Sequence, residues 1–198
     1  MISAILLAAG QSTRVPETNK LLIKYKKKLL INHILGELIK SKINKIFIVL
    51  GHEYFKVKKF CLKNKKINFV VNKNFKRGIS SSIKSGLKKI KESDEGFLIV
   101  QSDMPFIKST HINKIYNSIK KNNKLVHVLN YKTQIGNPIG FNISVVKKFT
   151  KIKGDVGAKY MVKRLKKETN FIPVNSDKLF KDFDRLTDFR LWSVKINS

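Results

Sequence analysis

Short apolar runs alternate along the chain with segments whose apolar residues recur at helical spacing. The runs that predict buried strands in the first half are residues 2–7, 46–50, 67–71 and 97–100. Between the first two runs, residues 30–39 place their apolar side chains on one face of a helix, and residues 79–90 repeat this pattern later. Such alternation is typical of βαβ units built on a mostly parallel sheet.

The pattern continues through the second half with no repeat and no Pro/Gly/Ser-rich linker. The further expected elements are helices near residues 54–62, 109–120 and 156–167, strands at 125–129, into Phe141 and at 171–174, and a turn at 136–138. Residues 1–198 therefore predict a single domain. Its expected class is α/β, in three layers, with a mostly parallel sheet and helices on both faces.

Charge is the most unusual feature of the composition, because the formal net charge is +29. A strongly basic chain can bind nucleic acid or an anionic membrane. Here lysines are scattered over the whole length, and aromatic residues are not interleaved with them as in a stacking platform. The distribution favours a solvated basic surface, so neither nucleic acid nor a membrane is the expected partner.

Other features limit the compartment and the chemistry. No apolar run approaches the roughly 18 residues that a membrane-spanning helix needs. The first residues carry no basic segment ahead of their apolar stretch, which argues against a signal peptide and favours a cytoplasmic location. Cys61 is the only cysteine, so an internal disulfide and a thiolate metal cluster are both excluded.

A loop of small residues follows the first strand directly. It contains Leu7, Ala8, Ala9, Gly10 and Ser12. Small residues after a buried strand let backbone N–H groups approach a phosphate, and the spaced cations Arg14 and Lys20 can neutralise its oxygens. The loop matches neither the Walker A pattern nor the GxGxxG of dinucleotide binders. On these residues alone, an ordinary surface turn stays open as the alternative.

Two further segments contain residues suited to ligand binding. Asp103 follows the fourth strand, and Pro105 ends that strand at the sheet edge where ligands of open α/β sheets usually bind. Its carboxylate suits a metal ion, or a turn before proline. Ser80, Ser81 and Ser82 fall in the first turn of helix 79–90, where serine hydroxyls serve either as caps or as ligand contacts.

Six segments, in order, resemble the MobA-like nucleotidyltransferase family, which includes molybdenum cofactor cytidylyltransferase and a related guanylyltransferase. The resemblance covers nearly the whole chain. The segments are LAAGQSTR with NKLL at 7–22, Asn72 with GISSSI and Gly86-Leu87, Ser102-Asp103-Met104-Pro105, Gly136-Asn137-Pro138, Gly154-Asp155-Val156-Gly157-Ala158, and Asp182-Phe183-Asp184 with Asp188.

The resemblance implies a Rossmann-like nucleotidyltransferase fold and specific residue roles. Arg14 would bind the β- and γ-phosphates, Lys20 would neutralise the α-phosphate, and Asp103 would hold Mg²⁺, so these three form the expected catalytic set. Asp184 would be a second metal ligand. The implied nucleotide-binding residues are Leu7, Ala8, Ala9, Gly10, Ser12, Arg14, Lys20, Asn72, Gly78 and Ser82.

Within the family, the chain is most similar to molybdenum cofactor cytidylyltransferase. Ala9 stands where the guanylyl branch commonly has glycine, and the GISSSI run also resembles the cytidylyl branch. The implied reaction transfers CMP from CTP to the terminal phosphate of molybdenum cofactor and releases pyrophosphate. A molybdoenzyme or its chaperone is a further partner to consider. The alternatives are transfer to another small phosphate, such as a sugar phosphate, and an inactive basic nucleotide-binding relic.

Four residues, in three segments, depart from the family pattern. Val15-Pro16 replaces the usual Met-Gly, and proline removes a backbone donor that a phosphate could use. Asn137 replaces the usual histidine, which affects the expected recognition of the acceptor. Ser102 replaces a glycine, and we expect its side chain to crowd the metal site.

Overall fold

The computed structural model describes residues 1–15 and 18–194, which form one seven-stranded sheet and a small two-stranded hairpin. The strand order of the large sheet is β5-β4-β1-β6-β8-β7-β9. The strands are β1 (Ile2–Ala8), β4 (Lys45–Leu50), β5 (Ile67–Val71), β6 (Gly96–Gln101), β7 (Val126–Tyr131), β8 (Gln134–Asn142) and β9 (Thr169–Pro173). All neighbours are parallel except β8, which runs antiparallel to β6 and β7. The predicted mostly parallel α/β sheet is confirmed.

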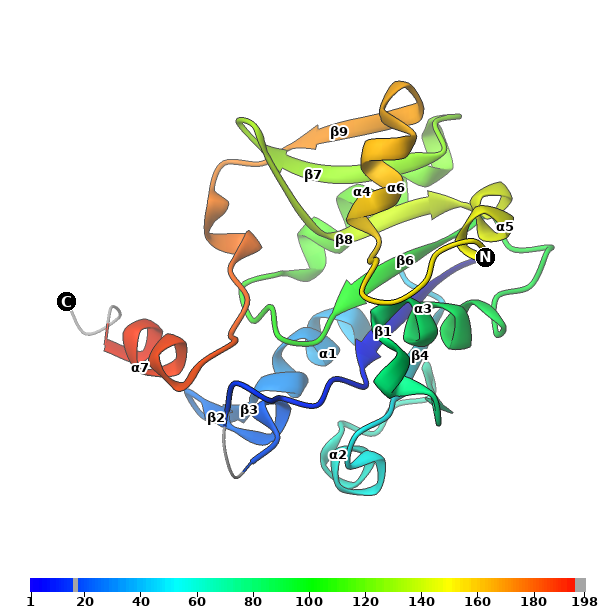
Figure 1. The fold of residues 1–198 in the computed structure, drawn as a ribbon. Coiled ribbons are helices and arrows are strands. Elements are labelled where there is room, and N and C mark those ends of the chain that lie inside the picture. Colours follow the sequence, from blue (N-terminus) through cyan, green and yellow to red (C-terminus); the bar gives the residue numbers. More distant parts are fainter. Residues whose placement is uncertain (16–17, 195–198) are drawn as a thin grey trace.

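Helices cover both faces of this sheet (Figure 1). One face packs against α1 (Leu30–Lys40), α2 (Tyr54–Phe60), α4 (Ser109–Lys121) and α7 (Leu186–Val194), and the other against α3 (Ile79–Leu87), α5 (Val146–Phe149) and α6 (Lys159–Arg164). Strand β1 serves both layers, because Ala4 and Leu6 enter the first core while Ile5 and Leu7 enter the second. The three-layer arrangement expected from the sequence is confirmed.

The strand order determines where a ligand can bind. From β1 the chain builds β4 and then β5 toward one edge of the sheet, and β6 then pairs with the opposite side of β1. The carboxyl ends of β1 and β6 therefore lie side by side at a point where the strand order reverses. In open α/β sheets this point opens a crevice for ligands.

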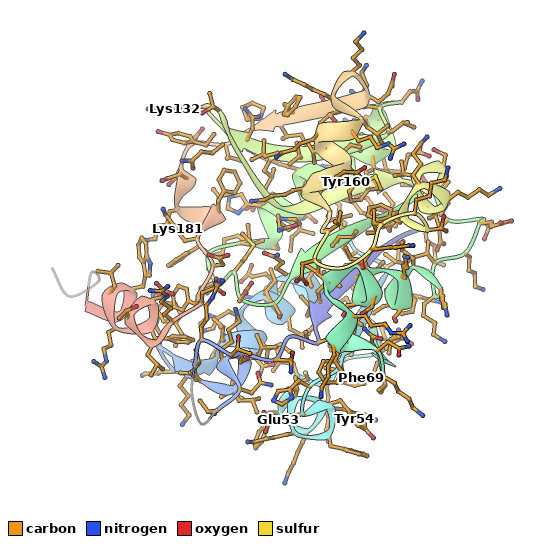
Figure 2. The ribbon with its side chains drawn as sticks, viewed as in Figure 1. Glu53, Tyr54, Phe69, Lys132, Tyr160 and Lys181 are labelled. Atoms are coloured by element: carbon orange, nitrogen blue, oxygen red, sulfur yellow. The ribbon has the colours of Figure 1, made fainter. Side chains whose placement is uncertain are left out.

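The turn expected at residues 136–138 is wrong, because these residues lie inside β8. The pairing of β7 with β8 shifts register between Val128 and Leu129, opposite this stretch. Such an irregularity accommodates Pro138, which has no N–H to donate to the ladder. The chain reverses instead at Lys132, which has a φ of 52° and lies at the tip of the β7–β8 hairpin (Figure 2).

Other boundaries also differ from expectation. The helix expected at 156–167 is divided into α6 and the 3₁₀ turn η4 (Lys166–Glu168), and α3 ends at Leu87. The hairpin of β2 (Lys24–Tyr25) and β3 (Lys28–Leu29) was not expected, because two-residue strands are too short to show a period. Helix α7 was not expected either, and it lies beside this hairpin (Figure 1).

The charged surface is distributed as the sequence suggested. Side chains ending in nitrogen project from all sides of the molecule in the view of Figure 2. Among the helices of the described residues, none is both long and apolar enough to cross a membrane.

Candidate active site

A cleft of about 340 Å³ opens at the carboxyl ends of β1 and β6. It is bordered by the loop after β1, the start of α3, the end of β6 and a segment near residue 155. The sequence-predicted residues that line it are Leu7, Ala9, Gly10, Ser12, Lys20, Gly78, Ser82 and Asp103. Most of the predicted nucleotide-binding set is therefore brought together in one cavity.

The loop after β1 is held in shape by its own polar groups. Ser12 has a φ of 55°, and its carbonyl accepts the N–H of Val15 at 2.9 Å. The Ser12 hydroxyl accepts the backbone N–H of Lys20 at 3.2 Å, and Asn19 Oδ1 accepts the N–H of Leu21 at 3.1 Å. These bonds fix the backbone of Lys20 at the mouth of the cleft. Pro16, which departs from the family pattern, lies outside the described residues.

Four charged side chains meet at the end of this loop. Lys20 Nζ donates to Asp103 Oδ2 at 2.7 Å and to Asp184 Oδ1 at 2.6 Å. Arg14 Nη1 donates to Asp184 Oδ2 at 2.8 Å. The Phe183 N–H donates to the Asp103 carbonyl at 2.9 Å, which holds the segment before α7 against the end of β6. The three expected catalytic residues and the expected second metal ligand thus form one connected cluster.

The contacts within this cluster shift the pKa values of Lys20 and Asp184. Burial alone would lower the pKa of Lys20, but the negative charge of Asp103 and hydrogen bonds to both carboxylates outweigh it, so the pKa is raised. Burial alone would raise the pKa of Asp184, but Lys20 and Arg14 outweigh it and the pKa is lowered. Lys20 and Asp184 are therefore both held in their charged forms at neutral pH.

The carboxylate oxygens of Asp103 and Asp184 are suitable ligands for a divalent cation. Asp103 Oδ1 is buried and has no hydrogen-bond partner among the described residues, and the other oxygen of Asp103 shares one ammonium group with Asp184. Carboxylate oxygens are the preferred protein ligands of Mg²⁺ and Mn²⁺. Within the described ranges, no group of three or more His, Cys, Asp or Glu side chains could hold a metal. Such a cation would therefore depend on these carboxylates together with oxygens from a substrate.

The serine-rich start of α3 is arranged by Asn72. Its amide nitrogen donates to the hydroxyls of Ser81 at 2.9 Å and Ser82 at 3.1 Å. Asn72 is buried and does not line the cleft, whereas Ser82 does. Asn72 therefore contacts Ser82 from the protein interior and does not itself face the cleft.

Three other predicted residues lie outside the cleft lining. Ala8 is buried in the sheet. Arg14 and Asp184 line a second cavity of about 400 Å³, and Asp184 is joined to Lys20 of the cleft by an ion pair.

Asp155 is a cleft residue that sequence reasoning did not select. Its Oδ1 accepts the N–H of Ile79 at 3.3 Å, and the Gly154 carbonyl accepts the N–H of Ser80 at 3.1 Å. Gly78 permits this approach, since a Cβ there would lie 2.4 Å from the Gly154 carbonyl carbon and its φ is 90°. The available signal was the Gly154-Asp155 segment, which resembles a family motif.

Ser102 does not act as expected, because its hydroxyl donates to the Leu7 carbonyl at 2.7 Å. The side chain joins β6 to β1 instead of extending toward the carboxylates. Asn137, which also departs from the family pattern, is buried, and its Oδ1 has no hydrogen-bond partner within the described part of the chain.

Comparison with known proteins identifies the family of this chain. Residues 4–169 match the model of the MobA-like NTP transferase domain. Adenosylcobinamide-phosphate guanylyltransferase of Methanocaldococcus jannaschii is 34% identical over 121 residues, which are 58% of this chain and 58% of that protein. The alignment thus spans little more than half of the relative's length.

Solved structures share the fold at low identity. Rv0371c of Mycobacterium tuberculosis superimposes with a TM-score of 0.85 at 20% identity, covering 97% of each chain. A second structure of Rv0371c, in complex with manganese, gives a TM-score of 0.78 at 17% identity, with 98% of each chain covered.

The 4-diphosphocytidyl-2C-methyl-D-erythritol synthase of Anaerococcus prevotii gives a TM-score of 0.80 at 17% identity, covering 100% of this chain and 96% of that one. Likeness at this level concerns the fold alone. The family assignment follows from the domain model, which matches most of the chain. This chain belongs to the MobA-like NTP transferases, a family of nucleotidyltransferases.

Proposed function

We propose that this protein transfers CMP from CTP to the terminal phosphate of molybdenum cofactor and releases pyrophosphate. The observation that carries the proposal is the cluster of Arg14, Lys20, Asp103 and Asp184 at the end of the loop after β1. It combines two cations for phosphate oxygens with two carboxylates for a divalent cation. Charge neutralisation and positioning are the main requirements of such transfers.

In this proposal, residues of the cleft and of the neighbouring cavity bind different parts of the triphosphate. Backbone N–H groups of the loop from Gly10 to Ser12 face the phosphates, and Arg14 neutralises the β- and γ-phosphates. Lys20 neutralises the charge that develops on the α-phosphate as the acceptor oxygen attacks it. A phosphate monoester is already ionised near neutral pH, so the reaction needs no side chain as a base.

Asp103 and Asp184 are the proposed ligands of a divalent cation, which is Mg²⁺ in this proposal. When bound, the cation would neutralise phosphate charge and orient the α-phosphate. The unpaired, buried Asp103 Oδ1 supports this role, as does the manganese complex of the structurally similar Rv0371c.

The choice of cytosine rests on the wall formed by Ala9. The Ala9 methyl lies close to Gly51, since a Cβ on Gly51 would lie 2.8 Å from Ala9 Cβ, and Phe75 Cβ would lie 2.6 Å from the same position. Ala9 and Phe75 both line the cleft. Replacing glycine with alanine at such a crowded position reduces the room for a purine.

A second candidate is guanylyl transfer to adenosylcobinamide phosphate. It is favoured by the 34% identity with the Methanocaldococcus guanylyltransferase. In both candidates the acceptor is a phosphate carried by a large cofactor. The donor base therefore separates them.

Transfer to a sugar phosphate stays an alternative to transfer to molybdenum cofactor. An inactive relic would not need to retain Arg14, Lys20 and Asp103, yet here they form one bonded network with Asp184. The proposed location is the cytoplasm, and a molybdoenzyme or its chaperone is the proposed recipient of the product.

The test is pyrophosphate release with Mg²⁺, pairing each of CTP, GTP, ATP and UTP with molybdenum cofactor, adenosylcobinamide phosphate and a panel of sugar phosphates. We expect the fastest turnover with CTP and molybdenum cofactor. Preference for GTP and adenosylcobinamide phosphate would establish the second candidate. Lys65→Met, which removes an exposed lysine, is the control for Lys20→Met, and only the latter should lose activity. No turnover with any pair would reject nucleotidyl transfer.

A further inference from the structure

The ammonium group of Lys20 lies between the two carboxylates that would hold a cation. Its Nζ contacts Asp103 Oδ2 at 2.7 Å and Asp184 Oδ1 at 2.6 Å, while Arg14 pairs with the other oxygen of Asp184. The side chains of Lys20 and Asp103 are only 16% and 15% exposed. Water therefore screens this pair less than it screens an ordinary surface ion pair.

The four bonded side chains are formally neutral without a metal, because two carboxylates are balanced by one ammonium and one guanidinium group. Asp182 lies near this cluster as a third carboxylate and interacts electrostatically with Asp103, Asp184 and Lys20. A divalent cation entering alone would add two positive charges beside Lys20 and Arg14, and like charges at this distance repel. A cation arriving with a triphosphate brings compensating negative charge, so the repulsion is removed.

The geometry of Lys20 allows it to leave the carboxylates without a change of fold. Its backbone N–H is fixed by the Ser12 hydroxyl at 3.2 Å, while the four-carbon stem of a lysine is flexible. Lys20 also lines the cleft in which the phosphates are proposed to bind. The ammonium group can therefore exchange its carboxylate partners for the α-phosphate while the loop stays in place.

We infer that Lys20 keeps divalent metal out of the site until a nucleoside triphosphate binds. This inference rests on the proposed function, and it adds an order to the reaction. In the free protein the lysine occupies the cation position between Asp103 and Asp184. Binding of the triphosphate moves the lysine onto phosphate oxygens, and the same two carboxylates then become available to the metal.

The test measures binding of Mn²⁺ alone to the whole chain, without nucleotide, by electron paramagnetic resonance of free Mn²⁺. Lys20→Met removes the charge and keeps an apolar stem of similar length. We expect it to tighten Mn²⁺ binding about tenfold or more relative to the unaltered protein. Lys76→Met is the matched control, because Lys76 also lines the cleft but, among the described residues, forms no hydrogen bond or ion pair with either carboxylate. Its affinity should stay within about twofold of the unaltered protein.

A double variant identifies the site that gains the metal. Lys20→Met combined with Asp103→Asn should lose the gain, because one of the two ligands is gone. Circular dichroism and thermal melting of each variant verify that it is folded. Equal Mn²⁺ affinity of the folded Lys20→Met variant and the unaltered protein would overturn the inference, and so would a gain that survives in the double variant.

This result is independent of the outcome for the proposed function. If the unaltered protein turns over a nucleotide but Lys20→Met binds Mn²⁺ no better, only the exclusion role of Lys20 fails. If no nucleotide is turned over, the proposed function fails, and the Mn²⁺ titrations still decide whether Lys20 competes with the metal.

Discussion

Lys20 and Asp184 are 164 residues apart in the chain, yet Lys20 Nζ donates a hydrogen bond of 2.6 Å to Asp184 Oδ1. The family model ends at residue 169, so Asp184 lies beyond the matched region. The segment before α7 thus contributes a carboxylate to the loop that follows β1. This connection joins the proposed phosphate cations to the proposed metal ligands.

Replacing Asp103 tests whether the carboxylates of the cluster take part in the reaction. We expect Asp103→Ala to lower kcat about a hundredfold or more, because it removes a proposed metal ligand beside the transferring phosphate. The variant should stay folded, as circular dichroism would verify, although it loses the ion pair with Lys20. Glu168→Ala, at an exposed position in η4, is the control. Full activity of the Asp103 variant would remove Asp103 from the metal site.

Replacing Asp155 tests whether its hydrogen bond to the Ile79 N–H positions the start of α3 for nucleotide binding. We expect Asp155→Ala to raise KM for the triphosphate about tenfold, because the Ile79 N–H loses its acceptor and Ser82 is less well placed. Asp155→Asn keeps a side-chain oxygen and should show a smaller effect. Steady-state kinetics on both variants check this, and identical KM values for all three proteins would contradict it.

Phe183 tests how the segment before α7 is anchored. Its ring is fully buried and lies 4.8 Å from Tyr25 and 4.9 Å from Phe189, between ring centroids. We expect Phe183→Ala to lower the free energy of unfolding by about 3–5 kcal/mol through loss of this packing. Urea unfolding measures the change. Phe171→Ala, at a side chain 40% exposed, should cost much less, and equal costs would contradict the anchoring role.

Cys61 gives a test that depends on pH. Burial raises the pKa of its thiol to about 11, so the reactive thiolate is scarce at pH 8. We expect the rate of reaction with an aromatic disulfide to rise with pH until it levels off near that pKa. In urea the same thiol should react with the ordinary pKa of about 8.5. An inflection near 8.5 in the folded protein would show that Cys61 is not buried in solution.

Local sequence patterns predicted the strands and helices whose apolar residues recur with a clear period or form a continuous run. The apolar run before Ala8 is buried on both faces of the sheet, so its composition alone indicates a central strand. The segment from Gly136 to Pro138 misled the same reasoning, because its residue types are those of turns. There the irregular pairing of β7 with β8 accommodates the proline, and such pairing depends on contacts between segments.

The sequence by itself determined the α/β class with a mostly parallel sheet, the loop after β1 and, through the resemblance to a family, the identity of most proposed site residues. The elements are indicated by the local periodicity of apolar residues, and the site residues by short motifs that occur in the family's order along the chain. Only the tertiary structure decided that Lys20 bonds both Asp103 and Asp184, that Asp155 holds the start of α3, and that Asn72 lies behind Ser82. The physical reason is that a side chain's partners are set by how strands and helices pack, and residues far apart in sequence carry no local sign of that contact.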